Sequence, residues 1–131
     1  MQNMDDSLQS MTFDFFGSGK HKIAADQFFA LDDALFLDVR SREELASLRF
    51  ALQHHMPTLQ IPIDEIPARL HEIPKEPLIG IFCPAGIRAS MVYAYLRSND
   101  YPNVRILVGG YDAITAELKP GKLHKRLAST L

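Results

Sequence analysis

Short, mostly apolar runs that alternate with stretches of helical character constrain the fold of this chain most strongly. Runs without regular polar interruption suit strands that are covered on both faces. The expected strands are residues 34–39, 59–63, 78–83 and 104–110. The expected helices are residues 24–31, 41–50, 63–72, 87–100 and 111–118. This alternation predicts an α/β fold with a mainly parallel central sheet flanked by helices.

The length and composition indicate one compact domain. The chain has 131 residues, of which 47% are hydrophobic and 23% charged, and this is enough to bury a sizeable core. We interpret residues 1–20 as an N-terminal extension whose aromatic side chains pack onto the body. Residues 21–118 form the domain, and residues 119–131 form a basic C-terminal tail. We expect Pro120 and Gly121 to break the chain before a last short helix in that tail.

Charge and cysteine content limit the partners and the compartment. A formal net charge of -2 and a pI near 6.2 provide no general attraction for nucleic acid or for an anionic membrane, so neither is an expected partner. A single cysteine forms no internal disulfide, which favours a reducing, cytoplasmic location. The first ten residues carry Asp5 and Asp6 instead of the basic and apolar regions of a signal peptide, and no run approaches membrane-spanning length.

That cysteine, Cys83, lies where an expected strand turns into an expected helix. Reactive groups of open α/β sheets gather at the carboxyl ends of strands. The turn contains Gly86, which adopts backbone conformations closed to other residues, and it leads into a helix whose first N–H groups lack partners. These amides, between Ala85 and Ala89, would form a cradle that favours a thiolate, and Arg88 adds a positive charge nearby. The same donors would hold a persulfide sulfur or an oxyanion.

Two other interpretations of Cys83 compete with a reactive thiol that handles sulfur. Free cysteine is among the most buried residue types, so an inert core position is the simplest alternative. The strand end, the glycine turn and Arg88 together favour a reactive one. Cysteine phosphatases place five residues between the cysteine and the arginine, whereas four separate Cys83 from Arg88. We therefore rank an oxyanion enzyme of the phosphatase or arsenate-reductase type well below an enzyme that handles sulfur.

At these residues the chain resembles the rhodanese-like family of sulfurtransferases, over about residues 21–118. Three motifs occur in order: "DVR" at residues 38–40 with Glu44 after it, "CPAGIRAS" at residues 83–90, and "LVGGYDAI" at residues 107–114. The resemblance implies a three-layer rhodanese-like fold. It also implies that Cys83 is the catalytic nucleophile and that Pro84, Ala85, Gly86, Ile87, Arg88 and Ala89 form the loop that binds the substrate.

The resemblance further implies a mechanism and a set of partners. The Cys83 thiolate would take a sulfane sulfur from thiosulfate, 3-mercaptopyruvate or a protein persulfide, and a thiol acceptor would then remove it. No cofactor is required, and a sulfur-relay protein is a further expected partner. The loop residues "PAG" carry no charge, so turnover of thiosulfate is expected to be slow. The competing class is a non-catalytic rhodanese-fold module that carries sulfur or binds a partner protein.

Asp38 and Arg40 are candidates for a supporting role around the cysteine loop. Our preferred interpretation is structural: Arg40 pairs with Glu43 or Glu44, and Asp38 caps the helix that follows. The five histidines show neither helical i, i+4 spacing nor a cysteine partner at zinc-ligand spacing, so no metal site is expected.

Overall fold

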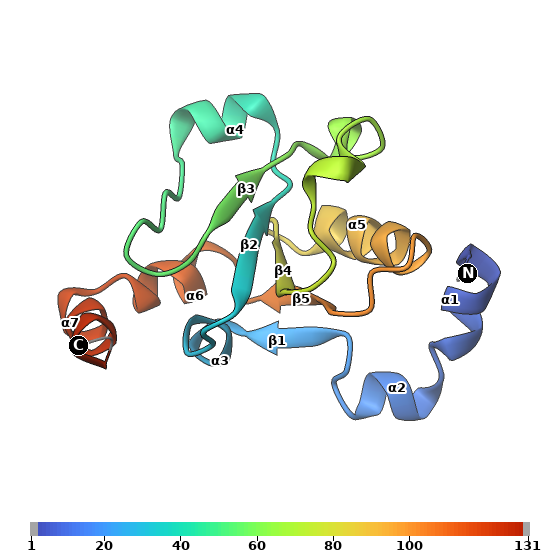
Figure 1. Cartoon of the computed structure of the whole chain (residues 1–131), viewed down its shortest axis with the longest axis horizontal. Helices are drawn as coiled ribbons and strands as arrows, with labels where there is room; N and C mark the ends of the chain where they lie inside the picture. Colours follow the sequence, from blue (N-terminus) through green and yellow to red (C-terminus); the bar gives the residue numbers. More distant parts are fainter. Residues whose placement is uncertain (1–2, 130–131) are drawn as a thin grey trace.

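A five-stranded, fully parallel sheet forms the centre of the protein (Figure 1). The computed structural model describes residues 3–129. The strand order is β1-β5-β4-β2-β3. The strands are β1 (Lys22–Ala24), β2 (Ala34–Asp38), β3 (Thr58–Gln60), β4 (Leu78–Phe82) and β5 (Val104–Val108). In the register, Asp38 lies between Gln60 of β3 and Phe82 of β4, which brings the carboxyl ends of three strands together.

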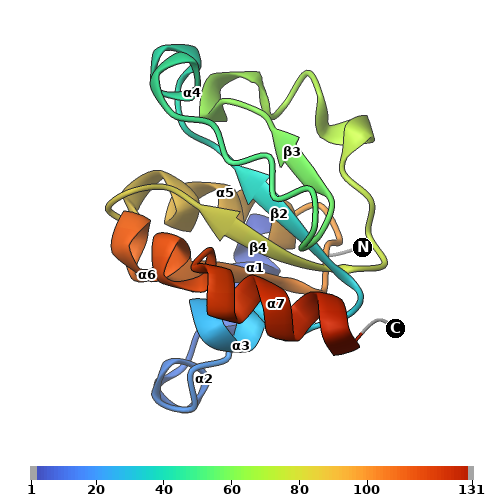
Figure 2. The ribbon, with the colours of Figure 1, turned by 90° about the vertical axis from the view of Figure 1, so that its left-hand side faces the viewer.

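Helices cover both faces of this sheet. The helices are α1 (Met4–Ser10), α2 (Phe13–Gly17), α3 (Ala25–Phe29), α4 (Arg42–Ser47), α5 (Ile87–Arg97), α6 (Gly110–Glu117) and α7 (Pro120–Ser129). Helices α3, α6 and α7 lie together over one face, and α1 and α5 lie over the other (Figures 1 and 2). Helix α4 extends beyond the carboxyl end of β2 (Figure 1). Within residues 3–129, no helix combines the length and the apolarity needed to cross a membrane.

The sheet divides the core into two clusters, and this explains why the strand sequences are almost continuously apolar. Leu35 and Leu37 of β2 face the α5 side, whereas Ala34 and Phe36 of the same strand face the α3 and α6 side. Every residue of β2 is buried. Because successive side chains point to opposite faces, burial on both faces requires apolar residues at every position rather than at alternate ones.

The four predicted strands are confirmed, with boundaries that differ from the prediction by at most three residues. The short edge strand β1 was not predicted. Four of the predicted helices are present, but the expected helix over residues 63–72 is wrong. This segment forms two 3₁₀ turns, η1 (Ile63–Glu65) and η2 (Leu70–Glu72). Pro67 lies between them and has no N–H to donate to the carbonyl of Ile63, so a continuous α-helix is interrupted there.

The two ends of the chain also differ from the expectation. Pro120 was expected to break the chain, but it is the first residue of α7, a position where its fixed φ angle suits a helix. In the N-terminal segment, the aromatic packing expected of residues 1–20 holds for Phe15, which joins the core, whereas Phe13 is 94% exposed. Packing of α1 is further supported by a hydrogen bond from Arg97 of α5 to the Ser10 hydroxyl.

Close packing at Gly80 in β4 gives a test of this core. A Cβ atom at Gly80 would lie 2.6 Å from Cε1 of the fully buried Phe28. We predict that Gly80→Ala lowers the free energy of unfolding by about 1–3 kcal/mol, because the added methyl group overpacks the core. Urea denaturation measures this change.

Gly17 provides the matched control, since a Cβ atom there would have no neighbour within 4 Å. Gly17→Ala should leave the stability unchanged or raise it by up to about 1 kcal/mol. Equal effects of the two substitutions would contradict the packing described for the α3 face.

Candidate active site

Cys83 lies immediately after β4, at the carboxyl end of the sheet. Its side chain is only 2% exposed. Two backbone N–H groups donate to its Sγ atom, that of Gly86 at 3.1 Å and that of Ala89 at 3.2 Å. The sulfur is therefore held inside the loop by main-chain donors. These amides, at the start of α5, point the positive ends of their N–H bonds at the sulfur.

The loop from Pro84 to Ala89 owes its shape to local sequence. Gly86 precedes the first residue of α5 and has a φ angle of 84°, a left-handed conformation that strains residues with a side chain. Of the amides expected to line the cradle, those of Gly86 and Ala89 contact the sulfur. Ala85 and Ile87 are exposed at the surface of the loop.

A second glycine holds the loop from the side of α6. A Cβ atom at Gly110 would lie 2.7 Å from the carbonyl oxygen of Pro84, and Gly110 has a φ angle of 61°. Only glycine permits this close approach. The Gly109–Gly110 pair thus forms a tight turn that packs against the cysteine loop.

Arg88, which was expected to provide positive charge near the sulfur, forms an ion pair with Glu44 of α4. Its two terminal nitrogens lie 2.6 and 3.1 Å from the Glu44 carboxylate oxygens. Glu44 also accepts hydrogen bonds from the backbone N–H and the hydroxyl of Ser41, which caps α4. The hydrogen bond from Arg88 is the largest cause that lowers the pKa of Glu44, to about 2. In return, Glu44 raises the pKa of Arg88.

Asp38 and Arg40 form a buried ion pair next to the cysteine loop, and both side chains are 0% exposed. The guanidinium of Arg40 binds both carboxylate oxygens of Asp38 at 2.7 to 3.1 Å. It also donates to the Tyr111 hydroxyl at 3.0 Å and to the Leu48 carbonyl at 2.8 Å. Burial opposes the charge on Arg40, but the bonds to Asp38 and Tyr111 outweigh this effect and raise its pKa.

This network corrects the sequence-based interpretation of both residues. Arg40 does not pair with Glu43 or Glu44, and Ser41 rather than Asp38 accepts the capping hydrogen bond of α4. The guanidinium of Arg40 also lies 5.3 to 5.6 Å from the ring centres of Phe50, Phe82 and Tyr111. Phe82 directly precedes Cys83, so Arg40 supports the strand end from which the loop begins.

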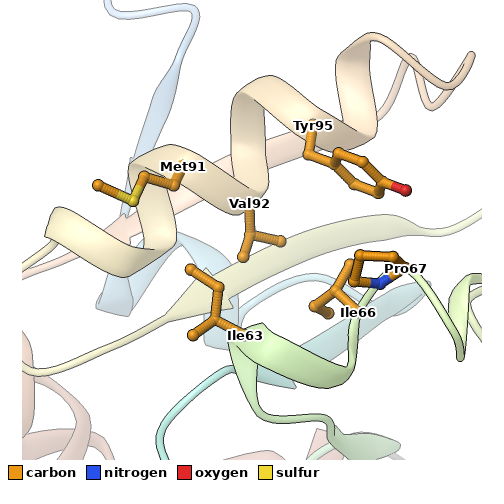
Figure 3. A pocket seen from close by; sticks show the side chains of 6 residues that line it. All are labelled: Ile63, Ile66, Pro67, Met91, Val92 and Tyr95. Atoms are coloured by element: carbon orange, nitrogen blue, oxygen red, sulfur yellow. The ribbon is translucent and has the colours of Figure 1, made fainter.

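An apolar cavity of about 190 Å³ lies on one flank of α5. Figure 3 shows side chains from α5 and from the η1 region that face one another across it. The cavity is lined by Ile63, Ile66, Pro67, Met91, Val92 and Tyr95. These side chains include no nucleophile and no carboxylate, so the cavity does not form part of the reacting centre. Over residues 3–129, no three His, Cys, Asp or Glu side chains form a group suited to a metal ion.

Comparison with known proteins identifies the family of this fold and loop. A family model described as "Rhodanese-like domain" matches residues 23–117. The chain belongs to the rhodanese-like family. The rhodanese-like fold is also that of a rhodanese-like domain protein from Staphylococcus aureus, with a TM-score of 0.57 and 27% sequence identity. That comparison covers 72% of this chain and 90% of the other.

Two relatives differ in how much of their length this chain spans. A sulfurtransferase from Allochromatium vinosum is 38% identical over 80 residues, which are 60% of this chain and 69% of the relative. A tRNA uridine(34) hydroxylase from Cronobacter sakazakii is 30% identical over 113 residues, 80% of this chain. Only 31% of that hydroxylase is covered, so the similarity concerns one part of a longer protein. The rhodanese-like domain and the first relative support a sulfurtransferase-type role.

The sequence identified the loop but missed the contacts that hold it. Glu44 follows the first of the three sequence motifs, yet its bond to Arg88 spans 44 residues of sequence. The contact between Tyr111 and Arg40 spans 71 residues. No local pattern encodes either contact.

The lowered pKa of Glu44 predicts a pH dependence of stability. Its ordinary value is 4.5 and its value in the folded protein is about 2. The carboxylate therefore contributes stability that is present above pH 4.5 and is lost as the pH falls toward 2. We predict that Glu44→Gln lowers the melting temperature at pH 7 and makes its decline between pH 4.5 and 2 shallower. Thermal unfolding followed by circular dichroism at a series of pH values measures this.

Glu43→Gln is the matched control, because Glu43 is exposed on the same helix. It should keep the decline of the wild-type protein. If Glu44→Gln and the wild type lose stability in parallel below pH 4.5, the ion pair with Arg88 does not contribute as described.

Proposed function

We propose that this chain is a single-domain sulfurtransferase that carries a sulfane sulfur as a persulfide on Cys83. The observation that supports it most directly is the pair of amides, from Gly86 and Ala89, that donate to the sulfur of a cysteine at a strand end. The rhodanese-like domain match and the sulfurtransferase from Allochromatium vinosum agree with this proposal.

The reaction has two displacement steps. The Cys83 thiolate attacks the sulfane sulfur of the donor, a sulfur–sulfur or carbon–sulfur bond of the donor breaks, and the donor leaves with the bonding electron pair. The thiolate of an acceptor then attacks the outer sulfur, and the Cys83 sulfur leaves as a thiolate. Neither step needs an external oxidant or reductant. The cradle amides stabilise negative charge on the sulfur before the first step and after the second.

Features of the loop bear on the choice of donor. The residues Pro84, Ala85 and Gly86 carry no charge, and Arg88 is paired with Glu44. A doubly charged donor such as thiosulfate therefore finds little free positive charge in the loop itself. We propose that thiosulfate is a slow donor and that 3-mercaptopyruvate or a protein persulfide is a better one. A sulfur-relay protein and a cytoplasmic location fit a chain that works through an unpaired thiol.

The same features favour one alternative, a rhodanese-fold module that carries or binds without efficient turnover. A carrier accepts sulfur from a protein persulfide and releases it slowly. A pure binding module accepts no sulfur. Steady-state release of thiocyanate in the presence of cyanide distinguishes an enzyme from both.

Intact mass spectrometry tests the persulfide. We predict that incubation with 3-mercaptopyruvate adds the mass of one sulfur atom, that cyanide removes it, and that thiosulfate gives slower loading. Cys83→Ser should stay unloaded while its circular dichroism spectrum matches that of the wild type. Sulfur loading in Cys83→Ser, or no loading of the wild type by either donor, would contradict the assignment of Cys83 as the enzymatic sulfur carrier.

A further inference from the structure

A second cavity, of about 330 Å³, lies beside the cysteine loop and is not accounted for by the chemistry above. Its size falls in the range typical of small-molecule sites, roughly 300–1,000 Å³. It is lined by His21, Lys22, Ala85, Gly86, Ile87, Ser90, Ile106 and Val108. Four of these residues belong to the cysteine loop and the first turn of α5, and His21 and Lys22 lie at the start of the edge strand β1.

The charged lining of this cavity is entirely basic. Lys22 is exposed and lines the cavity, while no Asp or Glu does. Arg105 lies close by and donates to the carbonyl oxygen of Lys22. Burial lowers the pKa of His21, and the charges of Lys22 and Arg105 lower it further, so the imidazole is neutral at neutral pH. The site therefore offers the positive charge of Lys22 beside a neutral imidazole.

His21 is held in place but has an unused hydrogen-bonding group. Its ring makes an edge contact with Phe16, with 4.9 Å between the ring centres. Its Nδ1 atom is buried and has no hydrogen-bond partner among the described residues. A buried polar atom without a partner is costly, so a small shift of the His21 ring that let a ligand bond to Nδ1 would remove this cost.

The cavity is next to the loop that holds the sulfur of Cys83. The amide nitrogen of Gly86, a lining residue, is 3.1 Å from the Cys83 Sγ atom. A Cβ atom at Gly86 would have no neighbour within 4 Å, so the space beside this residue is open. Its neighbour Ala85 is small and exposed. A ligand that occupies the cavity is therefore close to the loop that presents the sulfur.

We propose that this cavity binds the carboxylate end of a small thiol acceptor, with Lys22 and His21 as the recognition residues. The inference rests on the proposed function, because it names the class of acceptor. Lys22 pairs with the carboxylate, His21 provides a hydrogen bond, and Ile87 and Val108 contact the carbon chain. The thiol end extends past Gly86 toward Cys83. The acceptor thiolate attacks the outer sulfur of the persulfide, a new sulfur–sulfur bond forms, and the Cys83 thiolate leaves.

The positive charge of Lys22, which lies outside the cysteine loop, complements a loop sequence that carries little free charge. Pro84, Ala85 and Gly86 carry no charge. The charge of Arg88 is paired with Glu44. Lys22 therefore supplies charge that the loop lacks. Selection among acceptors then depends on a group some distance from the reacting sulfur, which suits a thiol with a carboxylate at its far end.

The first experiment compares two thiols with the same number of carbon atoms, 3-mercaptopropionate, which ends in a carboxylate, and 3-mercapto-1-propanol, which ends in an uncharged hydroxyl group. The full chain is loaded with sulfur on Cys83, and the rate of sulfur discharge to each thiol is followed by intact mass. The ratio of the two discharge rates in each variant is compared with the ratio in the wild type. This comparison cancels the intrinsic reactivities of the two thiols. The variants are Lys22→Gln and Lys22→Glu, with Lys119→Gln as the control for an exposed lysine away from the cavity.

We expect the preference for the carboxylate thiol to fall about threefold in Lys22→Gln, the effect of one partly screened ion pair. It should fall further in Lys22→Glu and stay unchanged in Lys119→Gln. High salt should reduce the wild-type preference, because it screens the same attraction. If the ratio of the two discharge rates in Lys22→Glu equals that of the wild type, the proposal that this cavity binds the acceptor carboxylate is wrong.

A second experiment tests the cavity without any sulfane sulfur. The resting protein reacts with 3,3′-dithiodipropionate or with bis(3-hydroxypropyl) disulfide, and the Cys83 thiolate displaces one thiol to form a mixed disulfide with the same tail. Lys22→Glu should slow the reaction with the charged disulfide selectively. If Cys83 never carries sulfur but this selectivity depends on Lys22, the proposed binding site is supported and the proposed function is wrong. If Cys83 carries sulfur and neither selectivity depends on Lys22, the proposed function is supported and the proposed binding site is wrong.

Discussion

The buried ion pair between Asp38 and Arg40 is the interaction on which the active-site end of the protein depends. Both side chains are removed completely from solvent, and an unpaired charge in such a place costs about 3–5 kcal/mol. The cost is offset here because the guanidinium has further partners, the Tyr111 hydroxyl and the Leu48 carbonyl. These bonds connect the end of β2 to α6 and to the segment after α4. With total stability typically about 5–15 kcal/mol, the fold tolerates this pair only in its fully bonded form.

The cysteine loop is built onto this support and is fixed from two sides. Gly110, next to Tyr111, packs directly against the carbonyl of Pro84. On the other side, the ion pair of Arg88 with Glu44 connects the start of α5 to α4. The loop therefore presents the Gly86 and Ala89 amides to the sulfur with little freedom to rearrange. Preorganised donors of this kind stabilise charge without reorganisation during the reaction.

Features that depend on residues close together in the sequence were mostly predictable, and contacts between distant residues were not. The strands and most helices depend on local apolar patterns, and Cys83 with its glycine turn forms a local motif, so these were predictable. The helix expected over residues 63–72 from its apolar spacing does not form, because Pro67 interrupts it. The partner of Arg40 was missed although Asp38 is only two residues away, because the burial that brings these two side chains together depends on the packing of distant segments. The cavity beside the loop joins Lys22 to Gly86 through the pairing of β1 with β5, and β1 itself was not predicted.

Two backbone amides donate to the sulfur of Cys83, and the proposed reaction requires them to stabilise its negative charge. The most direct measurement is the pH titration of amide proton resonances in the ¹⁵N-labelled protein, with thiolate absorbance recorded on the same samples. We predict that the Gly86 and Ala89 resonances shift together with ionisation of Cys83, and that they shift more than the resonance of Leu96 farther along α5. These shifts should disappear in Cys83→Ser. Resonances of Gly86 and Ala89 that ignore the ionisation of Cys83, or that shift equally in Cys83→Ser, would contradict this role of the two amides.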